Sequence, residues 1–253
     1  MKRKTIVRKR LTSGLTLAFW LLLLAGNSFG QGIVLPGVGP INRSMGGAAT
    51  AAPIDSAGAI HWNPATITNL KSEMMFGAEF VYTQTEISST LTPNSFGPGV
   101  PPVALSGTDP SRSGLPILPT ISLVHNPEGS PMTLGLGVFT IGGFSVNYPA
   151  SLSNPVLTAQ PPNGFGIGNG FSRLSLIQIA PTIAYKLSDR LSFGFAPTVT
   201  IGDLTLSPAL FAAPDDANGD LVPSFPSAVN GRPRYGLGFQ IGLYLETESS
   251  WNF

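Results

Sequence analysis

Two long runs of alternating side chains between Arg173 and Leu206 place the strongest constraint on the fold. A tight polar turn, Ser188-Asp189-Arg190, joins the runs, and every second position in each run is large and apolar. These positions are Ile177, Ile179, Pro181, Ile183, Tyr185 and Leu187 in the first run, and Leu191, Phe193, Phe195, Pro197, Val199 and Ile201 in the second. Because side chains alternate between the two faces of a strand, each run predicts a strand with one apolar face and one small or polar face.

Each run exceeds the roughly five or six residues of an average soluble strand and supplies the roughly 9–11 that a tilted strand needs to cross a bilayer. The small, hydroxyl-bearing face offers little apolar area to bury, so it would make a poor soluble core. It suits a water-facing lumen, with the apolar face turned to lipid. The sequence therefore predicts an all-β fold, a transmembrane antiparallel β-barrel.

Further alternating runs occur at residues 73–87, 117–125, 132–141 and 234–247. The segments between these runs are alternately long and short. The long ones (88–116, 142–172 and 207–232) are rich in Gly, Pro and Ser, and 126–131 is an example of a short one. Bacterial barrels have short periplasmic turns and long extracellular loops, so this rhythm predicts that the long stretches face the outside. Pro119, Pro181 and Pro197 lie inside the runs and each removes a ladder donor, which predicts a bulge or a kink at each.

Composition narrows the class of protein further. Only 11% of the residues are charged, against roughly 25% in soluble domains. Six of the 14 Lys and Arg lie in the first ten residues, so eight remain beyond residue 30 against 13 Asp and Glu, a net charge of −5. That balance argues against nucleic acid as a partner. The chain has no cysteine, which excludes disulfides and thiol catalysis.

Residues 1–30 have the pattern of a secretory signal peptide. A basic start precedes the apolar run Leu11–Ala25, and Ser28-Phe29-Gly30 offers small residues for cleavage before Gln31. The alternative is an uncleaved anchor helix, for which the apolar run is short. An exported chain with a barrel pattern predicts the outer membrane of a Gram-negative-type envelope.

Residues 31–70 are rich in Gly and Ala and end in the run His61-Trp62-Asn63-Pro64-Ala65. The stretch is too apolar for a free tail and too irregular for a strand. Packed inside a barrel, it would form a plug. The expected domains are therefore a signal peptide (1–30), an N-terminal hatch (31–70) and a barrel (71–253).

From about Gly39 onward the chain resembles the FadL/TodX (OMPP1) family of outer-membrane transporters. The resemblance rests on the Ala-rich approach to Asn63-Pro64-Ala65, on Asp55 eight residues before Asn63, and on the amphipathic strand that follows. It implies a barrel of about 14 strands with a hatch inside, monomeric when complete, which takes up long-chain fatty acids or aromatic hydrocarbons by passive diffusion. The expected partners are these hydrophobic small molecules, together with outer-membrane lipid and lipopolysaccharide.

The number of runs is smaller than the resemblance implies. About six or seven strands cannot close a barrel around a lumen, since roughly eight leave room only for side chains. We therefore expect a partial barrel, truncated at the C-terminus, that corresponds to the N-terminal portion of the family.

The resemblance also assigns candidate site residues. It implies that Asn63, Pro64 and Ala65 form the hinge of the hatch, with Trp62 and Met45 as apolar contacts for the substrate. The alternative is a general porin or an adhesin-like structural barrel. An open pore has no use for a Gly/Ala-rich plug, so this segment favours the transporter.

No catalytic motif accompanies His61 or His125, so we expect neither an enzyme nor a cofactor. One metal candidate stands in the third long stretch, where Asp216, Asn218 and Asp220 alternate like calcium ligands. A full calcium loop would need Gly in place of Leu221 and Glu in place of Ser227, so an ordinary turn-rich loop is the alternative.

Overall fold

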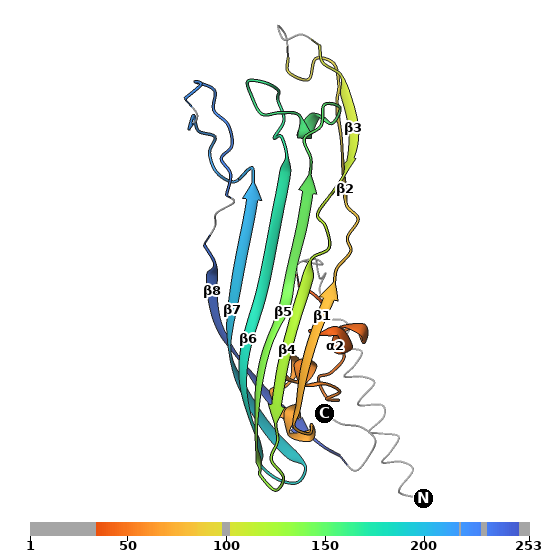
Figure 1. The fold of residues 1–253 in the computed structure, drawn as a ribbon, viewed down its shortest axis with the longest axis vertical. Helices are drawn as coiled ribbons and strands as arrows, with labels where there is room; N and C mark the ends of the chain where they lie inside the picture. The colour runs from red at the N-terminus through yellow and green to blue at the C-terminus, as the bar shows by residue number, and fades with distance from the viewer. Residues whose placement is uncertain (1–33, 98–101, 218, 229–231, 248–253) are drawn as a thin grey trace, which may run out of the picture. The chain divides into compact units, whose positions relative to one another are not determined.

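The computed structural model describes residues 34–97, 102–217, 219–228 and 232–247 (Figure 1). The predicted signal peptide and the start of a further strand at residues 251–253 lie outside these ranges. None of the helices in the described ranges is both long and apolar enough to cross a membrane.

Six strands form one antiparallel sheet in the order β1-β4-β5-β6-β7-β8, and they run side by side in Figure 1. They are β1 (Glu73–Phe80), β4 (Ile117–His125), β5 (Met132–Tyr148), β6 (Gly170–Lys186), β7 (Leu191–Ser207) and β8 (Arg234–Leu245). Within the described residues β1 and β8 pair on one side only, so the sheet is open. The antiparallel β-barrel wall predicted from the alternation is confirmed as a partial, unclosed sheet.

The two faces of this sheet differ as the alternation predicts. The outer face carries rows of large apolar side chains, such as Leu134, Ile183, Phe195 and Ile241 in register across four strands, and all four are exposed. Phe195 and Phe239 lie on this face with ring centroids 6.3 Å apart, and Phe239 is 67% exposed. The inner face carries small or hydroxyl side chains that are buried, among them Thr120, Ser122, Thr133, Ala180, Thr182, Ala184, Ser192 and Ala196.

The first long stretch contains a hairpin where the sequence indicated only a loop. β2 (Glu86–Leu91) pairs with β3 (Leu105–Pro110), and the first wall strand ends at Phe80, before the expected residue 87. Hydroxyl pairs join the two strands, with 2.7 Å between Ser88 Oγ and Thr108 Oγ1. Strands built from Ser and Thr lack the apolar alternation that identified the others.

Two wall strands are longer than their patterns indicated. β5 continues to Tyr148 and β6 begins at Gly170. The register of the β5–β6 ladder shifts between Thr140 and Gly142, so an extra residue reverses the alternation beyond it. That reversal hid the second half of β5 from a period-two reading.

The prolines inside the strands do not produce this bulge. Pro181 and Pro197 face each other where the β6–β7 ladder is interrupted between the pairs Ile179–Val199 and Ile183–Phe195. The register is the same on both sides of the interruption, so the ladder is broken but not shifted. Pro119 pairs with Ala78 in an unshifted ladder.

Residues 34–70, named here the inner segment, pack on the inner face. The segment contains α2 (Pro40–Ser44), α3 (Ser56–Trp62) and the 3-10 helix η1 (Pro64–Asn69), while another 3-10 helix, η2 (Pro155–Leu157), lies in the second long loop. α3 packs on β4 and β5, and η1 packs on β6, β7 and β8. Ile60, Ile67 and Phe139 are the largest apolar side chains fully buried between segment and sheet.

Candidate functional site

Asn63 connects the inner segment to the far side of the sheet. Its buried side chain caps η1, because Oδ1 accepts a hydrogen bond of 3.1 Å from the backbone N–H of Ala65. Its Nδ2 donates to the carbonyl of Thr50 at 2.9 Å and to the carbonyl of Leu243 in β8 at 3.0 Å. Both ends of the amide are therefore satisfied, as burial requires.

Two wall glycines make room for the Asn63-Pro64-Ala65 run. Gly194 of β7 and Gly242 of β8 are partners in the ladder. A Cβ at Gly194 would collide with the backbone of Pro64 and Ala65, and a Cβ at Gly242 would collide with Asn63 Oδ1. The small face of the strands is therefore a close-fitting seat for this run. We name Asn63–Ala65 with Gly194 and Gly242 the glycine seat.

The start of α3 is attached to the other side of the sheet. Asp55 caps the helix, with Oδ1 accepting from the Gly58 backbone N–H at 2.7 Å. Glu73 of β1 accepts from the Ser56 backbone N–H at 2.7 Å, and Ser56 Oγ lies 2.7 Å from Ser122 Oγ of β4. Burial raises the pKa of Asp55, assisted by the neighbouring Glu73 carboxylate and opposed by backbone hydrogen bonds.

Asn42 organises the Gly-rich start of the inner segment. Its Oδ1 accepts from the Val38 backbone N–H at 3.2 Å and from Trp62 Nε1 at 3.0 Å. Side chains at Gly37 or Gly58 would overlap Asn42. The glycines therefore allow one buried amide to join α2 and α3.

An ion pair joins α2 to the wall. Arg43 Nε lies 2.5 Å from Glu79 Oε2 of β1, and the two side chains are only 15% and 13% exposed. Arg43 Nη2 also donates to the carbonyl of Thr140 in β5 at 3.3 Å. Loss of one partner would leave the other as an uncompensated, nearly buried charge.

The His61 ring, on α3 of the inner segment, packs towards the wall. Its ring packs edge-on against Trp62 and Phe139, with centroids 4.9 and 5.5 Å away. Burial lowers the pKa of His61 to about 4; a hydrogen bond with Gln178 opposes this shift, and the nearby Arg43 charge assists it. Its backbone carbonyl accepts from Gln240 Nε2 of β8 at 2.8 Å.

The predicted site residues are only partly brought together. Asn63, Pro64 and Ala65 are buried in the glycine seat, while Trp62 and Met45 are 42% and 45% exposed. Both border Asn42, Trp62 through a side-chain hydrogen bond and Met45 through a backbone hydrogen bond. Ile41 and Ile54 of the same segment are also about half exposed. The roles of Asn63, Pro64 and Ala65 as hinge and of Trp62 and Met45 as substrate contacts stay predictions.

Sequence reasoning missed Asn42, Arg43 and Glu79. The sequence contains a partial indication of the ion pair. Arg43 lies in an apolar Gly/Ala-rich segment and Glu79 lies at an inward-facing position of β1, and a charged side chain in either place needs a partner of opposite charge. Their pairing across 36 positions could not be read from local spacing.

The calcium candidate remains a prediction. Asp216 Oδ1 accepts from the Leu221 backbone N–H at 3.1 Å, and Asp220 Oδ1 accepts from the Val222 N–H at 2.8 Å. Asn218 lies outside the described ranges. In the part of the chain that the structure describes, no three His, Cys, Asp or Glu side chains gather as a metal site.

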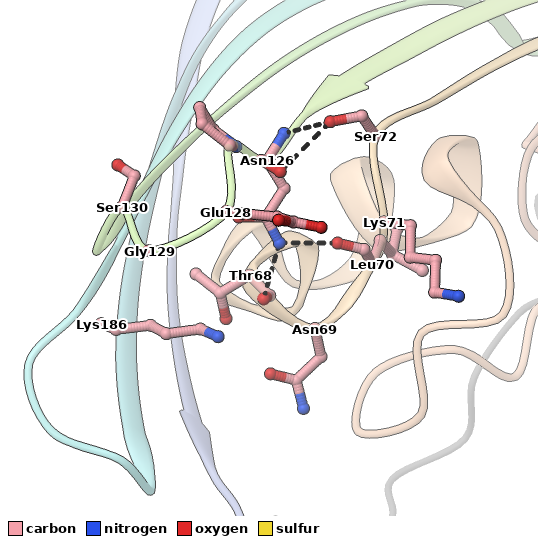
Figure 2. A pocket seen from close by; sticks show the side chains of 11 residues that line it. Thr68, Asn69, Leu70, Lys71, Ser72, Asn126, Glu128, Gly129, Ser130 and Lys186 are labelled. Carbon is pink, nitrogen blue, oxygen red and sulfur yellow. Dashed lines mark hydrogen bonds between the residues drawn. The ribbon is translucent and has the colours of Figure 1, made fainter.

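The inner segment ends at an open hollow of about 730 Å³ (Figure 2). Asn126, in the turn between β4 and β5, donates from Nδ2 to the carbonyls of Thr68 and Leu70 at 3.1 and 2.7 Å. Its backbone N–H donates to Ser72 Oγ at 2.9 Å, and Lys186 reaches in from the end of β6. This turn therefore holds the end of the segment against the wall.

Comparison with known proteins gives the same fold. A family model described as outer membrane protein transport protein (OMPP1/FadL/TodX) matches residues 22–251. The P. putida toluene transporter TodX superposes with a TM-score of 0.57 at 17% identity, over 85% of this chain and 53% of that one. A Pseudomonas aeruginosa FadL homologue superposes with a TM-score of 0.54 at 16% identity, over 85% of this chain and 50% of that one.

The chain therefore spans about half the length of these two solved structures. At such identities the likeness establishes the fold alone. No curated protein sequence gives a significant match.

Proposed function

The chain belongs to the outer membrane protein transport protein family (OMPP1/FadL/TodX), and on that premise we propose that it takes up hydrophobic compounds across the outer membrane. The substrates in this proposal are long-chain fatty acids or aromatic hydrocarbons, which diffuse passively through a barrel. Residues 31–70 are its hatch and residues 71–253 belong to its wall. The observation that carries the proposal is the glycine seat, where the backbone of Asn63–Ala65 occupies space that any wall side chain would fill.

The contacts of the inner segment suggest how the hatch works. Asn63, the Arg43–Glu79 ion pair and the Ser56–Ser122 hydroxyl pair fix it to β8, β1 and β4. Trp62 and Met45 present exposed apolar surface, where an apolar solute would gain by leaving water. A shift of the segment about Asn63-Pro64-Ala65 then opens a path along the inner face.

A reversible cross-link tests this proposal, because the natural chain has no cysteine to interfere. Ser56 Oγ and Ser122 Oγ are 2.7 Å apart, so Ser56→Cys with Ser122→Cys should form a disulfide between α3 and β4. We expect oxidised vesicles carrying this variant to lose saturable uptake of labelled oleate or toluene, and reductant to restore it. The two single variants are the controls.

Two outcomes would count against the proposal. Uptake that is unchanged after complete cross-linking would show that the segment does not need to move. Conductance for small hydrophilic solutes, without saturable uptake, would instead favour the porin alternative.

A further inference from the structure

The outward-facing positions of β1 continue beyond the end of the strand. Phe76 and Phe80 are exposed apolar side chains, and the same alternation then brings out Tyr82, Gln84 and Glu86. The outer face therefore changes from apolar at Phe76 and Phe80 to polar at Gln84 and Glu86, with the amphipathic Tyr82 between them. Such a change is typical of the boundary between lipid and water.

The chain forms a hollow at this boundary. Two backbone hydrogen bonds enclose it, from Val81 N–H to the Pro116 carbonyl at 3.0 Å and from Ser111 N–H to the Thr85 carbonyl at 2.8 Å. Between them, residues 82–84 lie opposite residues 112–115, and no backbone hydrogen bond among described residues joins the two stretches. Because the two stretches differ in length, they separate here and leave an open hollow of about 780 Å³ between them.

The neighbouring strands place this hollow at the upper edge of the apolar band. Ile177 and Ile201 form an outward-facing apolar pair in register across β6 and β7, and the next outward-facing positions, Ser175 with Asp203 and Ser145 with Arg173, are polar. Beyond them on β5, the Asn147 carbonyl accepts from the Arg112 backbone N–H at 2.7 Å. The hollow therefore has apolar wall below it and the long loops above it.

The side chains around the hollow suit an anionic, hydroxyl-rich group. Arg112 is exposed, and no described residue forms an ion pair with its guanidinium, which can bind a phosphate through two parallel hydrogen bonds. Gln84 Nε2 donates to Tyr82 Oη at 3.0 Å, which leaves the Gln84 carbonyl oxygen available as an acceptor. Glu86 adds a carboxylate acceptor, and Tyr82 and Leu115 are 71% and 58% exposed.

We propose that this hollow binds the phosphorylated sugar headgroup of an outer-leaflet glycolipid of the lipopolysaccharide type. Arg112 holds a phosphate, Gln84 and Glu86 accept hydrogen bonds from sugar hydroxyls, and the acyl chains lie along Phe80 and Leu115. The site depends on the proposed orientation, with the long loops outside, and is independent of hatch movement and of the transported compound.

Native mass spectrometry of the purified full chain in detergent micelles tests the site, with diphosphorylated lipid A as the probe. We expect Arg112→Ala to weaken lipid A binding about tenfold, the loss of one charge-assisted contact. The matched control is Arg234→Ala, since Arg234 lies at the same end of the sheet but alternates with the outward-facing Tyr235. Gln84→Leu, which keeps every charge, should weaken lipid A binding several-fold.

Three results would overturn the site. One is equal lipid A binding by wild type and Arg112→Ala, and another is an equal loss in Arg234→Ala. The third is binding of phosphatidylglycerol as tight as that of lipid A, which would reduce the site to a general anion contact. If Arg112→Ala fails to fold, Gln84→Leu decides alone. Oleate uptake is expected to be unchanged in Gln84→Leu, so failure here is distinguishable from failure of the proposed transport function.

Discussion

Two kinds of contact hold the inner segment against the wall. Polar side chains form hydrogen bonds across the interface, and glycines allow the two backbones to approach closely. The glycine seat combines both, because Asn63 donates to a β8 carbonyl while Gly194 and Gly242 admit the chain that carries it. A single methyl group at either glycine would displace backbone atoms, which cannot rotate away as a side chain can.

The first prediction concerns Gly242. We expect Gly242→Ala to lower the free energy of unfolding by about 1–3 kcal/mol, because the new Cβ overlaps Asn63 Oδ1. Gly236→Ala in the same strand is the control, since its Cβ would meet nothing closer than 3.9 Å. Urea unfolding in micelles measures both. Equal stability of the two variants would show that the inner segment does not occupy the seat in solution.

The second prediction concerns His61, whose pKa is lowered to about 4 by burial. The unfolded chain binds a proton at this side chain below about 6.5 while the folded chain does not, so stability is full above that pH. It falls as the pH drops from about 6.5 towards 4, by at most about 1.4 kcal/mol per unit. The raised pKa of Asp55 acts in the opposite direction, because protonation of that buried acid favours the folded chain at low pH.

Comparison with His61→Leu isolates the histidine contribution. Thermal unfolding between pH 4 and 7 should show a shallower pH dependence in His61→Leu than in the wild type. Identical slopes would place His61 in water and contradict its burial against Phe139.

Strands and loops show where local patterns are informative. The wall strands can be recognised from their apolar alternation, but the β2–β3 hairpin cannot. The hairpin is attached to the second long loop through the buried side-chain amide of Asn154. Asn154 Nδ2 donates to the carbonyls of Ile87 and Gly107 at 2.9 and 3.3 Å, and Asn154 is fully buried. Gly107 is the point of closest approach, since a Cβ there would lie 2.8 Å from the Asn154 nitrogen.

The third prediction follows from this attachment. Asn154→Ala leaves two partly buried carbonyls without this donor, so we expect the hairpin to detach at a cost of about 1–3 kcal/mol. Limited proteolysis should then cut within residues 86–110 several times faster, with the wall strands still protected. Asn163→Ala, at an exposed position of the same loop, should cleave like the wild type. Equal cleavage of both variants would refute the attachment.

The chain as a whole has an apolar outer face and a small, polar inner face covered by the inner segment. Adjacent positions on one strand therefore face opposite environments. Phe239 is 67% exposed on the outer face, while Gln240 points to the inner segment and donates to the His61 carbonyl.

The fourth prediction compares these neighbours. Phe239→Lys places a charge on the lipid-facing side and should reduce the free energy of folding into a bilayer by about 2–4 kcal/mol. Gln240→Lys keeps a donor towards the His61 carbonyl and should cost less. The folded fraction in lipid vesicles, read from heat-modifiable electrophoretic mobility, measures both. A larger loss in Gln240→Lys would reverse the assignment of the two faces.

Much of this architecture follows from local pattern. Residues 173–206 alternate strictly because every strand residue faces one side or the other, so side-chain order alone identifies the faces. The Gly/Ala-rich run before Asn63 likewise indicates close packing wherever it lies. The β2–β3 hairpin and the far half of β5 escaped such reading, because hydroxyl pairs and a bulge remove the alternation.

The partners of the inner segment depend on the folded chain alone. Asn63 meets Leu243 across 180 positions, and Arg43 meets Glu79 across 36. The local sequence predicts that a buried amide and a buried cation need partners. Which residues become those partners depends on which strands the sheet places beside them. Gly194 and Gly242 are ordinary small residues in the sequence and become the seat of Asn63-Pro64-Ala65 only because the ladder sets them side by side.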